Sequence, residues 1–384
     1  MTTGADPGQA LRQLVLLGAG HAHVHVLLGL GELARYLPAD LKVTVVSPWP
    51  RQLYSGMVPG FVAGHYELQQ CLIPLDGLLA RSGASHIADS CVSIDADAKS
   101  IVLASGQTLR YDWLSVNTGP VMDRARIDGS MPGASEHALF VRPIEAFGQL
   151  WPRVVALGTG RAIHIAVVGA GAAGLELAMA AAHALKRAPF CAGGKVSLVT
   201  GGGIVAENYP AAARRKIVRA LAQSGVALIR QACVGMNAGE IILDNGQHLA
   251  CDAPLLAVGA QAPGWLAGSG LALDPAGFME VNQFQQSTSH DAVFAAGDIA
   301  SRVDAPHSRS GVYAVRAGPP LLANLLAAVQ SQPLQAYPPA RRTLNLLSCG
   351  ERYAIAIWGG LTLEGRWVWR LKDWIDRKFV AQYL

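Results

Sequence analysis

The chain has 384 residues, and 31 Lys and Arg residues against 27 Asp and Glu residues give it a net charge of +4 at pH 7. Its hydrophobic residues make up 51% of the total, which excludes a wholly disordered chain. The small net charge and the lack of any run of five basic residues argue against a nucleic-acid partner.

The first predicted element is a short apolar strand that runs into a glycine turn and then an apolar helix. Such a turn lets backbone N–H groups approach a pyrophosphate, and the helix points its positive end at it. Gly18 and Gly20 are therefore candidate nucleotide-binding residues. His21 and Ala22 follow, with His21 expected beside the pyrophosphate. His23 replaces the third glycine of the fingerprint, so either the helix sits further out or His23 lies in a gap.

The next predicted strand ends at Ser47. The fingerprint has an acidic residue here that binds a ribose, and Ser47 is the remaining candidate for that hydrogen bond. The histidines in the preceding helix predict no metal site. His21 and His25 share a helical face, but His23 does not, and two ligands are too few for a structural zinc.

The pattern repeats in the middle of the chain. A second apolar strand leads into Gly169-Ala-Gly171-Ala-Ala-Gly174, so this copy has all three glycines. The strand that follows ends at Thr200 and again lacks the acid. Residues 211–224 are predicted as a helix with a solvated basic face.

A second repeated motif follows each copy of the glycine turn. Gly106 precedes Gly119 by 13 residues, and Gly246 precedes Gly259 by 13, with a Gly-Gln-x-Leu motif and an aspartate in each stretch. Two matched features in the same order predict an α/β fold with two Rossmann-like dinucleotide-binding domains.

Residues 293–298 read Val-Phe-Ala-Ala-Gly-Asp. With this motif the chain resembles the pyridine nucleotide-disulfide oxidoreductase superfamily of flavoproteins. The resemblance implies a glutathione-reductase-like arrangement, in which an FAD-binding domain at 1–120 and 265–330 is interrupted by an NAD(P)H-binding-like domain at 121–264. A short C-terminal region at 331–384 would cover the flavin, or contact a membrane or a second copy of the chain.

The resemblance also implies roles for particular residues. Asp298 would bind the ribitol of FAD. The other FAD positions would be Gly56, Val92, Thr118, Gly119, Gly297 and Val312, and the nicotinamide nucleotide, as co-substrate, would lie at Gly169, Gly171, Gly174, Thr200 and Gly259.

The positions of the cysteines limit which branch of the superfamily the chain resembles. Disulfide reductases carry a C-x4-C pair after the second strand, and this chain has none there. Cys349 lacks an evident partner of the kind that sulfide:quinone oxidoreductases use. Residues 54–60, 311–316 and 371–379 resemble the type II NADH dehydrogenase-like branch, in particular a subgroup also found fused to selenophosphate synthetase.

Two residues are catalytic candidates. The glutamate that matches Glu176 lies near the nicotinamide and flavin in NADH dehydrogenases of this kind, whereas the structural alternative is a helix-start glutamate that favours the positive dipole end. Tyr313, in a helix predicted to begin at Gly311, is a candidate flavin neighbour, and the alternative is a core tyrosine.

The C-terminal tail mixes tryptophans with basic residues between 366 and 379. This mixture is typical of an interfacial amphipathic helix. The preferred interpretation is a helix packed on the flavin domain or in a homodimer, because aromatic stripes are usually core. The apolar stretches 14–30 and 163–185 are predicted as strand–turn–helix units and not as spans. Scattered cysteines suit a reducing compartment, so we predict a cytoplasmic protein, with peripheral contact at the inner face of the membrane left open.

The sequence therefore predicts an FAD-dependent oxidoreductase that transfers hydride from NAD(P)H to FAD and on to an unidentified small-molecule acceptor, with a quinone as one candidate. One alternative is a flavoprotein that oxidises a sulfide or selenium species. Another is a flavin-binding scaffold or sensor without pyridine-nucleotide turnover, which the two missing ribose acids suggest.

Overall fold

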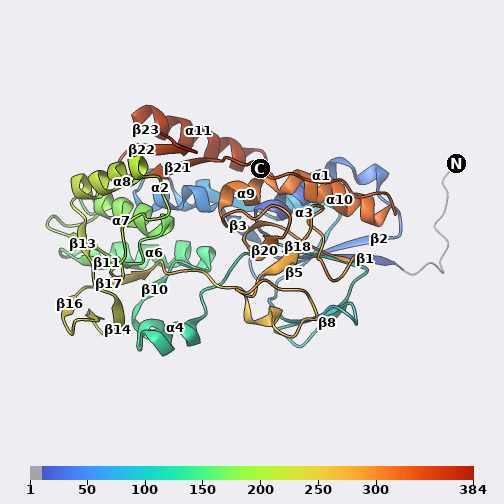
Figure 1. Ribbon diagram of the computed structural model, residues 1–384, viewed down its shortest axis with the longest axis horizontal. Coiled ribbons are helices and arrows are strands. Elements are labelled where there is room, and N and C mark those ends of the chain that lie inside the picture. Colours follow the sequence, from blue (N-terminus) through green and yellow to red (C-terminus); the bar gives the residue numbers. More distant parts are fainter. Residues whose placement is uncertain (1–10) are drawn as a thin grey trace.

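Two parallel sheets lie side by side along the long axis of the molecule (Figure 1). The structure is a computed structural model that describes residues 11–384. All strands of the first sheet are parallel. In spatial order they are β19 (Val293–Ala295), β9 (Trp113–Val116), β1 (Arg12–Leu17), β2 (Leu41–Val46) and β5 (Ser85–Ile87).

The second sheet repeats this arrangement. It is also wholly parallel. Its spatial order is β10 (Leu139–Phe140), β17 (Ala253–Leu256), β11 (His164–Val168), β12 (Lys195–Val199) and β13 (Ala227–Ile229). In both sheets the strand that precedes the glycine turn lies at the centre. These central strands are apolar almost throughout because both faces of each sheet are covered, one by helices and the other by a small antiparallel sheet.

In each sheet one edge strand pairs with a strand that is far from it in sequence. β19 follows the whole second sheet in sequence, yet it pairs with β9 in the first. β10 precedes the other strands of the second sheet and pairs with β17, the last of them. The expected fold is therefore confirmed: two Rossmann-like units, with the first interrupted by the second.

A three-stranded antiparallel sheet accompanies each parallel sheet. The first consists of β6 (Cys91–Asp95), β7 (Ser100–Leu103) and β8 (Thr108–Arg110), and the second of β14 (Cys233–Asn237), β15 (Glu240–Leu243) and β16 (His248–Ala250). Both show an irregular register at the start of their first strand, at Cys91 and at Cys233. The repeat therefore extends to the level of a single bulge.

Helices cover the two sheets. We call the first sheet with the segment 48–57 that follows β2 and with α1 (His21–Glu32), α3 (Asp76–Ser82), α9 (Gly311–Arg316) and α10 (Gly318–Val329) the first lobe. We call the second sheet with α7 (Ala172–Ala184) and α8 (Ala211–Ser224) the second lobe. The predicted strand–turn–helix units are confirmed as β1–α1 and β11–α7. Among residues 11–384 no helix is both long and apolar enough to cross a membrane. The smaller elements are β3 (Arg51–Leu53), α2 (Val58–Val62), β4 (Leu72–Pro74), α4 (Arg124–Ser130), α5 (Ala134–His137), α6 (Ile144–Thr159), β18 (Met279–Val281) and β20 (Ala300–Arg302).

The C-terminal residues form a separate layer at the top of Figure 1. We call it the C-terminal cap. It consists of the antiparallel strands β21 (Leu344–Ser348), β22 (Ala354–Trp358) and β23 (Leu361–Gly365), followed by α11 (Arg366–Ala381). The cap packs against α7 and α8 of the second lobe. Val368, Phe379 and Val380 of α11 are buried, so the tail forms a packed helix.

Candidate functional site

The first glycine turn is held against the end of β9. Gly18 has a positive φ of 87°, and a Cβ atom there would lie 2.7 Å from backbone atoms of Thr118. A Cβ atom on Gly20 would collide with Asn117. The helix α1 begins at His21, directly after this turn, and Gly20 is its N-cap. The turn thus has the close backbone approach and the helix start that a pyrophosphate site needs.

Asn117 connects three parts of the first lobe, and no sequence pattern pointed to it. Its side-chain oxygen accepts a hydrogen bond from the N–H group of Ala22 at 3.0 Å, and its amide nitrogen donates to the carbonyl of Ala296 at 2.5 Å. The backbone carbonyl of Asn117 accepts from Gly20 at 3.1 Å. Asn117 therefore fixes the glycine turn relative to the Gly297-Asp298 motif.

His23 lies in a gap, which answers the question that the missing glycine raised. The side chain is fully buried, and its Nδ1 lies 2.5 Å from the carbonyl oxygen of Gly18. Because a carbonyl only accepts, Nδ1 carries the proton, and Nε2 accepts from the hydroxyl of Ser115 at 2.8 Å. Burial lowers the pKa of His23 to about 4, so the ring is neutral.

The ring of His21 is turned toward β3 and the segment after it. Its Nδ1 accepts a hydrogen bond from the side chain of Gln52 at 2.8 Å, and its Nε2 lies 3.2 Å from the hydroxyl of Ser55. Burial and the nearby Arg142 lower the pKa of His21 to about 4. Only the backbone N–H group of His21 is therefore available at the start of α1. The expectation that the residue lies beside a pyrophosphate applies to its N–H group, because its ring is engaged elsewhere.

Asp298 lies beside an arginine that the sequence did not single out. Its carboxylate oxygen is 3.8 Å from the guanidinium of Arg142, and within residues 11–384 it makes no side-chain hydrogen bond. Burial raises the pKa of Asp298, and Arg142 opposes that rise. Arg142 thus stands near both the Gly297-Asp298 motif and His21. A mostly buried carboxylate without a hydrogen-bond donor fits the hydroxyl groups of a sugar or a ribitol chain.

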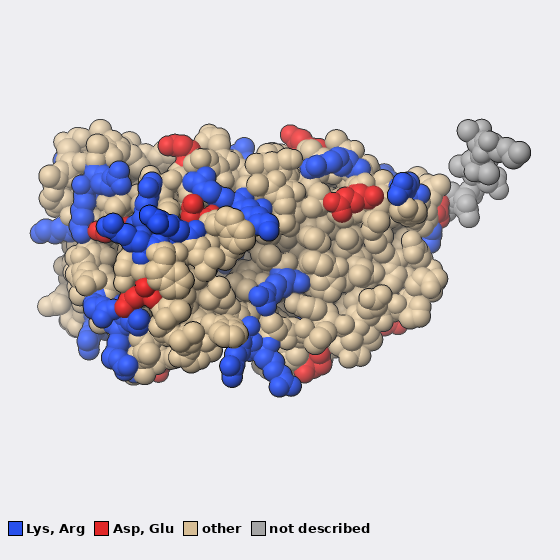
Figure 2. Space-filling model, turned by 90° about the horizontal axis from the view of Figure 1, so that it is seen from above, with Lys and Arg blue, Asp and Glu red and all other residues tan. Residues whose placement is uncertain are grey.

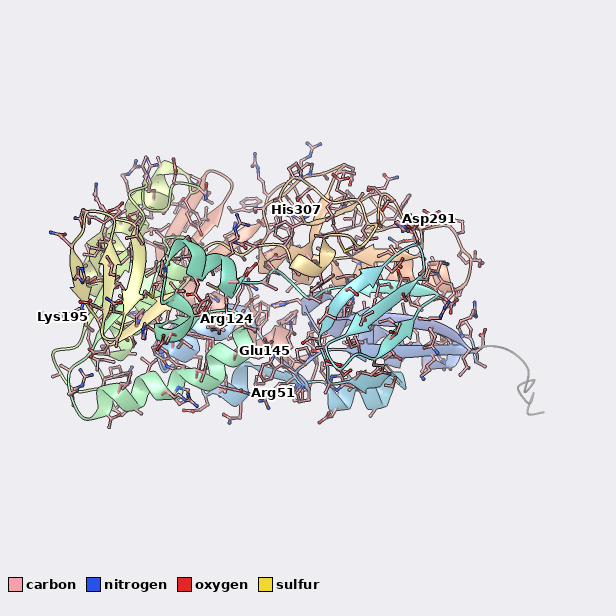
Figure 3. All side chains as sticks on the ribbon, turned by 90° about the horizontal axis from the view of Figure 1, so that it is seen from below. Arg51, Arg124, Glu145, Lys195, Asp291 and His307 are labelled. Atoms are coloured by element: carbon pink, nitrogen blue, oxygen red, sulfur yellow. The ribbon has the colours of Figure 1, made fainter. Side chains whose placement is uncertain are left out.

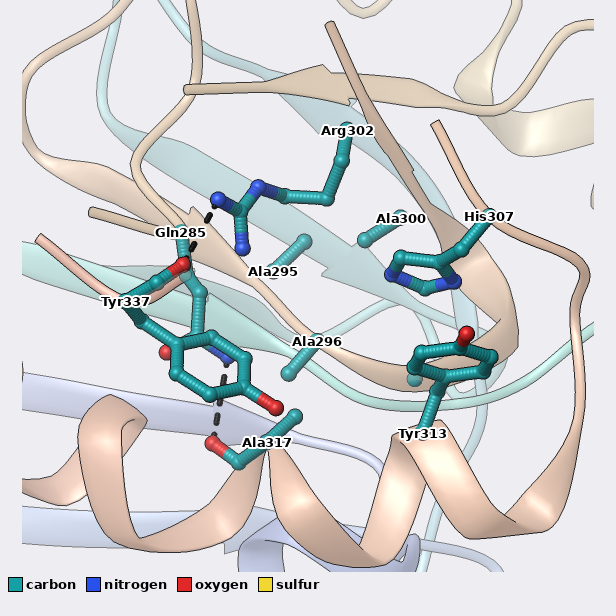
Figure 4. A pocket seen from close by; sticks show the side chains of 10 residues that line it. Gln285, Ala295, Ala296, Ala300, Arg302, His307, Tyr313, Ala317 and Tyr337 are labelled. Carbon is teal, nitrogen blue, oxygen red and sulfur yellow. Dashed lines mark hydrogen bonds between the residues drawn. The ribbon is translucent and has the colours of Figure 1, made fainter. Parts of the chain in front are cut away.

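Tyr313 lines a small cavity of about 20 Å³ behind this motif, together with Gly297, Arg302 and His307 (Figure 4). The rings of Tyr313 and His307 stack with centroids 3.9 Å apart. The hydroxyl of Tyr313 donates to the carbonyl of Ala340 at 3.1 Å. Tyr313 is buried, so both its ring and its hydroxyl are engaged by protein. Val312 precedes it in the first turn of α9.

The second glycine turn has the same geometry, and it requires glycine at Gly169 and also at Gly174. Gly169 has a φ of 112°, and a Cβ atom there would lie 2.5 Å from the carbonyl oxygen of Ala257. A Cβ atom on Gly174 would collide with the carbonyl of Gly169, whereas one on Gly171 would meet nothing within 4 Å. The N–H groups of Gly171 and Ala172 donate no hydrogen bond among the described residues. They are free to bind a phosphate.

The other residues predicted to bind a cofactor lie in different environments. Ser47 is buried, and its hydroxyl bonds the carbonyl of Trp49 within a local turn at 3.2 Å. The buried hydroxyl of Thr200 has no partner in the described chain. Val92 is half exposed on β6. Gly119 and Gly259 follow β9 and β17, at the same edge of each sheet as the glycine turns.

Glu176 points from α7 toward the C-terminal cap. Its Oε1 accepts a hydrogen bond from the N–H group of Ser348 at 2.7 Å. Burial raises the pKa of Glu176 to about 7, although Lys372 and the Ser348 hydrogen bond act against the rise. The side chain therefore does not cap its own helix. It is held where a carboxyl group can gain or lose a proton near neutral pH.

Lys372 completes this group from α11. Its ammonium donates to Asp376 at 2.6 Å and to the carbonyl oxygen of Gly56 at 2.6 Å. Both Lys372 and Asp376 are buried. Gly56 belongs to the first lobe, Glu176 to the second, and Lys372 to the cap, so three parts of the chain meet here. We call Gly56, Glu176, Ser348, Lys372 and Asp376 the junction cluster.

Aromatic rings flank the junction cluster on the side of the first lobe. Tyr54 lies 4.5 Å from Phe379 and 5.3 Å from His21, measured between ring centroids. Arg51 and Glu145 also lie close to the boundary between the lobes (Figure 3). Glu145 accepts a hydrogen bond from the N–H group of Leu53 at 3.3 Å, and burial raises its pKa.

Comparison with known proteins gives one family and several relatives. Residues 12–318 match the family described as pyridine nucleotide-disulphide oxidoreductase. An NADH dehydrogenase-like protein of Mycobacterium tuberculosis is 28% identical over 310 residues, which cover 77% of this chain and 75% of that protein. A sulfide-quinone reductase of Aquifex aeolicus is 31% identical over 112 residues, which cover 28% of this chain and 24% of that protein.

Solved structures resemble the whole chain. The sulfide:quinone oxidoreductase of Aquifex aeolicus has a TM-score of 0.79 at 18% identity and covers 97% of this chain and 91% of its own. The NDH2 of Plasmodium falciparum, solved in complex with NADH, has a TM-score of 0.79 at 11% identity, with 97% of both chains covered. At these identities the likeness shows a shared fold.

Proposed function

Because this chain belongs to the pyridine nucleotide-disulphide oxidoreductase family and is an oxidoreductase of its NADH dehydrogenase-like branch, we propose that it binds FAD in the first lobe. We propose further that NAD(P)H binds in the second lobe, and that the electrons leave to a quinone or a similar small acceptor. The domain limits predicted from the sequence, with FAD at 1–120 and 265–330, are part of this proposal.

The residues of the first lobe fit an FAD molecule. Gly18 and Gly20 have no room for a Cβ atom, and their turn offers the start of α1 to a pyrophosphate. Asp298 has no hydrogen-bond donor of its own in the described chain and would receive ribitol hydroxyls. Arg142 lies beside it and supplies a positive charge near the phosphates. When bound, FAD would accept hydride from the nicotinamide and pass the electrons to the acceptor.

The junction cluster is the observation that carries the proposal. A partly buried glutamate with a pKa near 7, a lysine and an aspartate meet there with the backbone of Gly56, a predicted flavin contact. Glu176 can hold or release a proton at its carboxyl group near neutral pH. The ammonium of Lys372 favours a negative charge nearby. Together these residues suit a reaction in which electrons and protons reach an acceptor beside the flavin.

An anaerobic titration of the purified protein tests the proposal. The absorbance of oxidised flavin is followed while NADH, and separately NADPH, is added in small steps. Bleaching by one equivalent of either nucleotide is the expected result. A flavin that bleaches with sulfide but with neither nucleotide would replace the proposal with oxidation of a sulfur or selenium species. If no donor reduces the flavin, the scaffold or sensor function would be the remaining candidate.

The sulfur chemistry has a candidate residue in Cys349, which follows Ser348 of the junction cluster. Its thiol is buried, and burial raises its pKa to about 12, with Glu176 acting in the same direction. The thiol is therefore protonated at neutral pH and is a poor nucleophile. This environment favours NAD(P)H over sulfide as the electron donor.

The outer face of the cap supports a membrane-bound acceptor. Trp358, Trp367 and Trp374 are more than half exposed, at 52%, 53% and 59%. Residues 341–384 contain eight Lys and Arg against four Asp and Glu. Figure 2 views the face that carries the cap, and Lys and Arg side chains gather over its left half. Exposed tryptophans among basic groups fit the headgroup region of an anionic membrane, where quinones are dissolved.

A further inference from the structure

The end of β12 lacks the carboxylate that binds the ribose of NADH in many Rossmann domains. The strand ends at Val199 and continues into Thr200 and the loop Gly201-Gly202-Gly203. Between Lys195 and Gln231 the chain has six basic residues and one acid, Glu207, which lies beyond the glycine loop. This region therefore carries no negative charge at the strand end where a ribose is expected.

Arg230 lies at the same edge of the sheet, directly after the neighbouring strand β13. β13 ends at Ile229, whose carbonyl accepts a hydrogen bond from the N–H group of Thr200 at 2.9 Å. The N–H group of Gly201 then donates to the carbonyl of Gln231 at 3.1 Å. These two hydrogen bonds place the backbone of Arg230 beside the start of the glycine loop. Arg230 is exposed and has no ion pair within the described residues.

The glycine loop leaves space and free donors beside Arg230. Gly201 and Gly202 have positive φ values of 74° and 81°, and a Cβ atom on Gly201 or Gly203 would meet nothing within 4 Å. Across residues 11–384 the N–H groups of Gly202 and Gly203 donate to no protein acceptor. Free N–H groups in a left-handed loop, together with an exposed arginine on the adjoining backbone, suit a phosphate group.

We infer that Arg230 and the glycine loop bind the 2′-phosphate of NADPH, so that the protein prefers NADPH to NADH. A guanidinium binds a phosphate through charge-assisted hydrogen bonds, and the missing carboxylate removes the repulsion that a 2′-phosphate would meet. NADH lacks this phosphate and leaves Arg230 solvated. This inference rests on the proposed binding of NAD(P)H in the second lobe, and it concerns a part of the nucleotide that is remote from the hydride.

The test measures binding without turnover. Adenosine 2′,5′-bisphosphate and 5′-AMP differ by the 2′-phosphate alone, and their dissociation constants for the purified protein are measured by isothermal titration calorimetry at low salt. We expect the bisphosphate to bind at least about tenfold more tightly. Arg230→Ala should bring the two affinities close together, and Arg230→Lys should keep part of the preference. Arg153→Ala, which removes an exposed arginine from α6, is the matched control and should change neither affinity.

Equal binding of the two nucleotides by the parent protein, or a preference that survives Arg230→Ala, would overturn the inference. The same data separate it from the proposed function. If the protein prefers the bisphosphate but neither NADH nor NADPH reduces its flavin, the phosphate site stands and hydride transfer is rejected. Equal bleaching by NADH and NADPH with equal nucleotide binding keeps hydride transfer and rejects the phosphate site.

Discussion

Glu176 on α7 accepts a hydrogen bond from the backbone N–H group of Ser348, 172 residues further along the chain. This contact joins the second lobe to the C-terminal cap at the position where Lys372 reaches the first lobe. Rotation of one part against another would break it. The protonation of Glu176 is therefore coupled to the packing of the cap.

Glu176→Gln should change the pH dependence of flavin reduction. The carboxyl group has a pKa of about 7, so its charge changes across the neutral range, whereas glutamine keeps the Ser348 hydrogen bond without a charge change. We expect the rate constant for flavin reduction by NAD(P)H to vary between pH 6 and 8 in the parent protein and to be flat in the variant. Stopped-flow absorbance measures it. Glu136→Gln, an exposed change on α5, serves as control, and an identical pH profile in parent and Glu176→Gln proteins would contradict the prediction.

His23 should make the protein less stable in mild acid. Its pKa falls from 6.5 to about 4 on folding, so between these values the unfolded chain binds a proton that the folded chain does not. The free energy of unfolding then decreases as the pH falls through this window, by up to about 1.4 kcal/mol per pH unit. Glu176, whose pKa rises on folding, acts in the opposite direction.

Urea unfolding at pH 7.5 and 5.5, in a Glu176→Gln background with and without His23→Gln, measures the effect of His23, because His21, whose pKa also falls to about 4, is the same in both proteins. His23→Gln should shrink the difference between the two pH values, and it should lower stability at pH 7.5 by about 2 kcal/mol because Gly18 and Ser115 lose well-placed partners. The prediction fails if the His23 variant keeps the full pH dependence.

The glycines of the second turn should respond differently to alanine. Gly174→Ala places a methyl group against the carbonyl of Gly169, so we expect a loss of about 2 kcal/mol in the free energy of unfolding. Gly171→Ala has room for its methyl group and should leave stability unchanged. It should weaken NAD(P)H binding by about tenfold, because the methyl group stands where a pyrophosphate would approach. Urea unfolding and nucleotide titration separate these effects, and similar stability losses in both variants would argue against this account.

The basic face of the cap should bind anionic vesicles. Each basic residue near such a surface contributes about 1 kcal/mol, so Arg366→Gln combined with Arg370→Gln should weaken binding roughly thirtyfold. Both arginines are exposed on α11. Co-sedimentation with phosphatidylserine-containing vesicles measures the effect, and Arg110→Gln with Arg153→Gln is the control pair on other elements. The membrane contact would be ruled out if the parent protein does not bind these vesicles, or if it forms a dimer that covers the tryptophans.

The repeated architecture could be predicted from local patterns. A glycine turn between an apolar strand and an apolar helix depends on residues close in sequence, and the 13-residue spacing of Gly106 and Gly119 was matched by Gly246 and Gly259. The predicted helix at 211–224 is confirmed as α8, with the same limits. These features needed no knowledge of the tertiary fold.

The junction cluster could not be predicted in this way. Lys372 and Gly56 are 316 residues apart, and their contact depends on how α11 crosses the first lobe. In the sequence Lys372 is one of several basic residues in the tail, and only the structure distinguishes it from its exposed neighbours. Asn117 was missed because its role comes from contacts with Ala22 and Ala296, which only the folded sheet brings together.

The late position of β19 in the sequence sets an order of events during protein synthesis. The strands of the second lobe run continuously from Leu139 to Leu256, so this lobe has its complete sheet as soon as it leaves the ribosome. The first lobe emerges earlier but lacks β19 until Ala295 has been made. The part of the chain that is translated first is therefore completed second, with the β9 edge open in the interval.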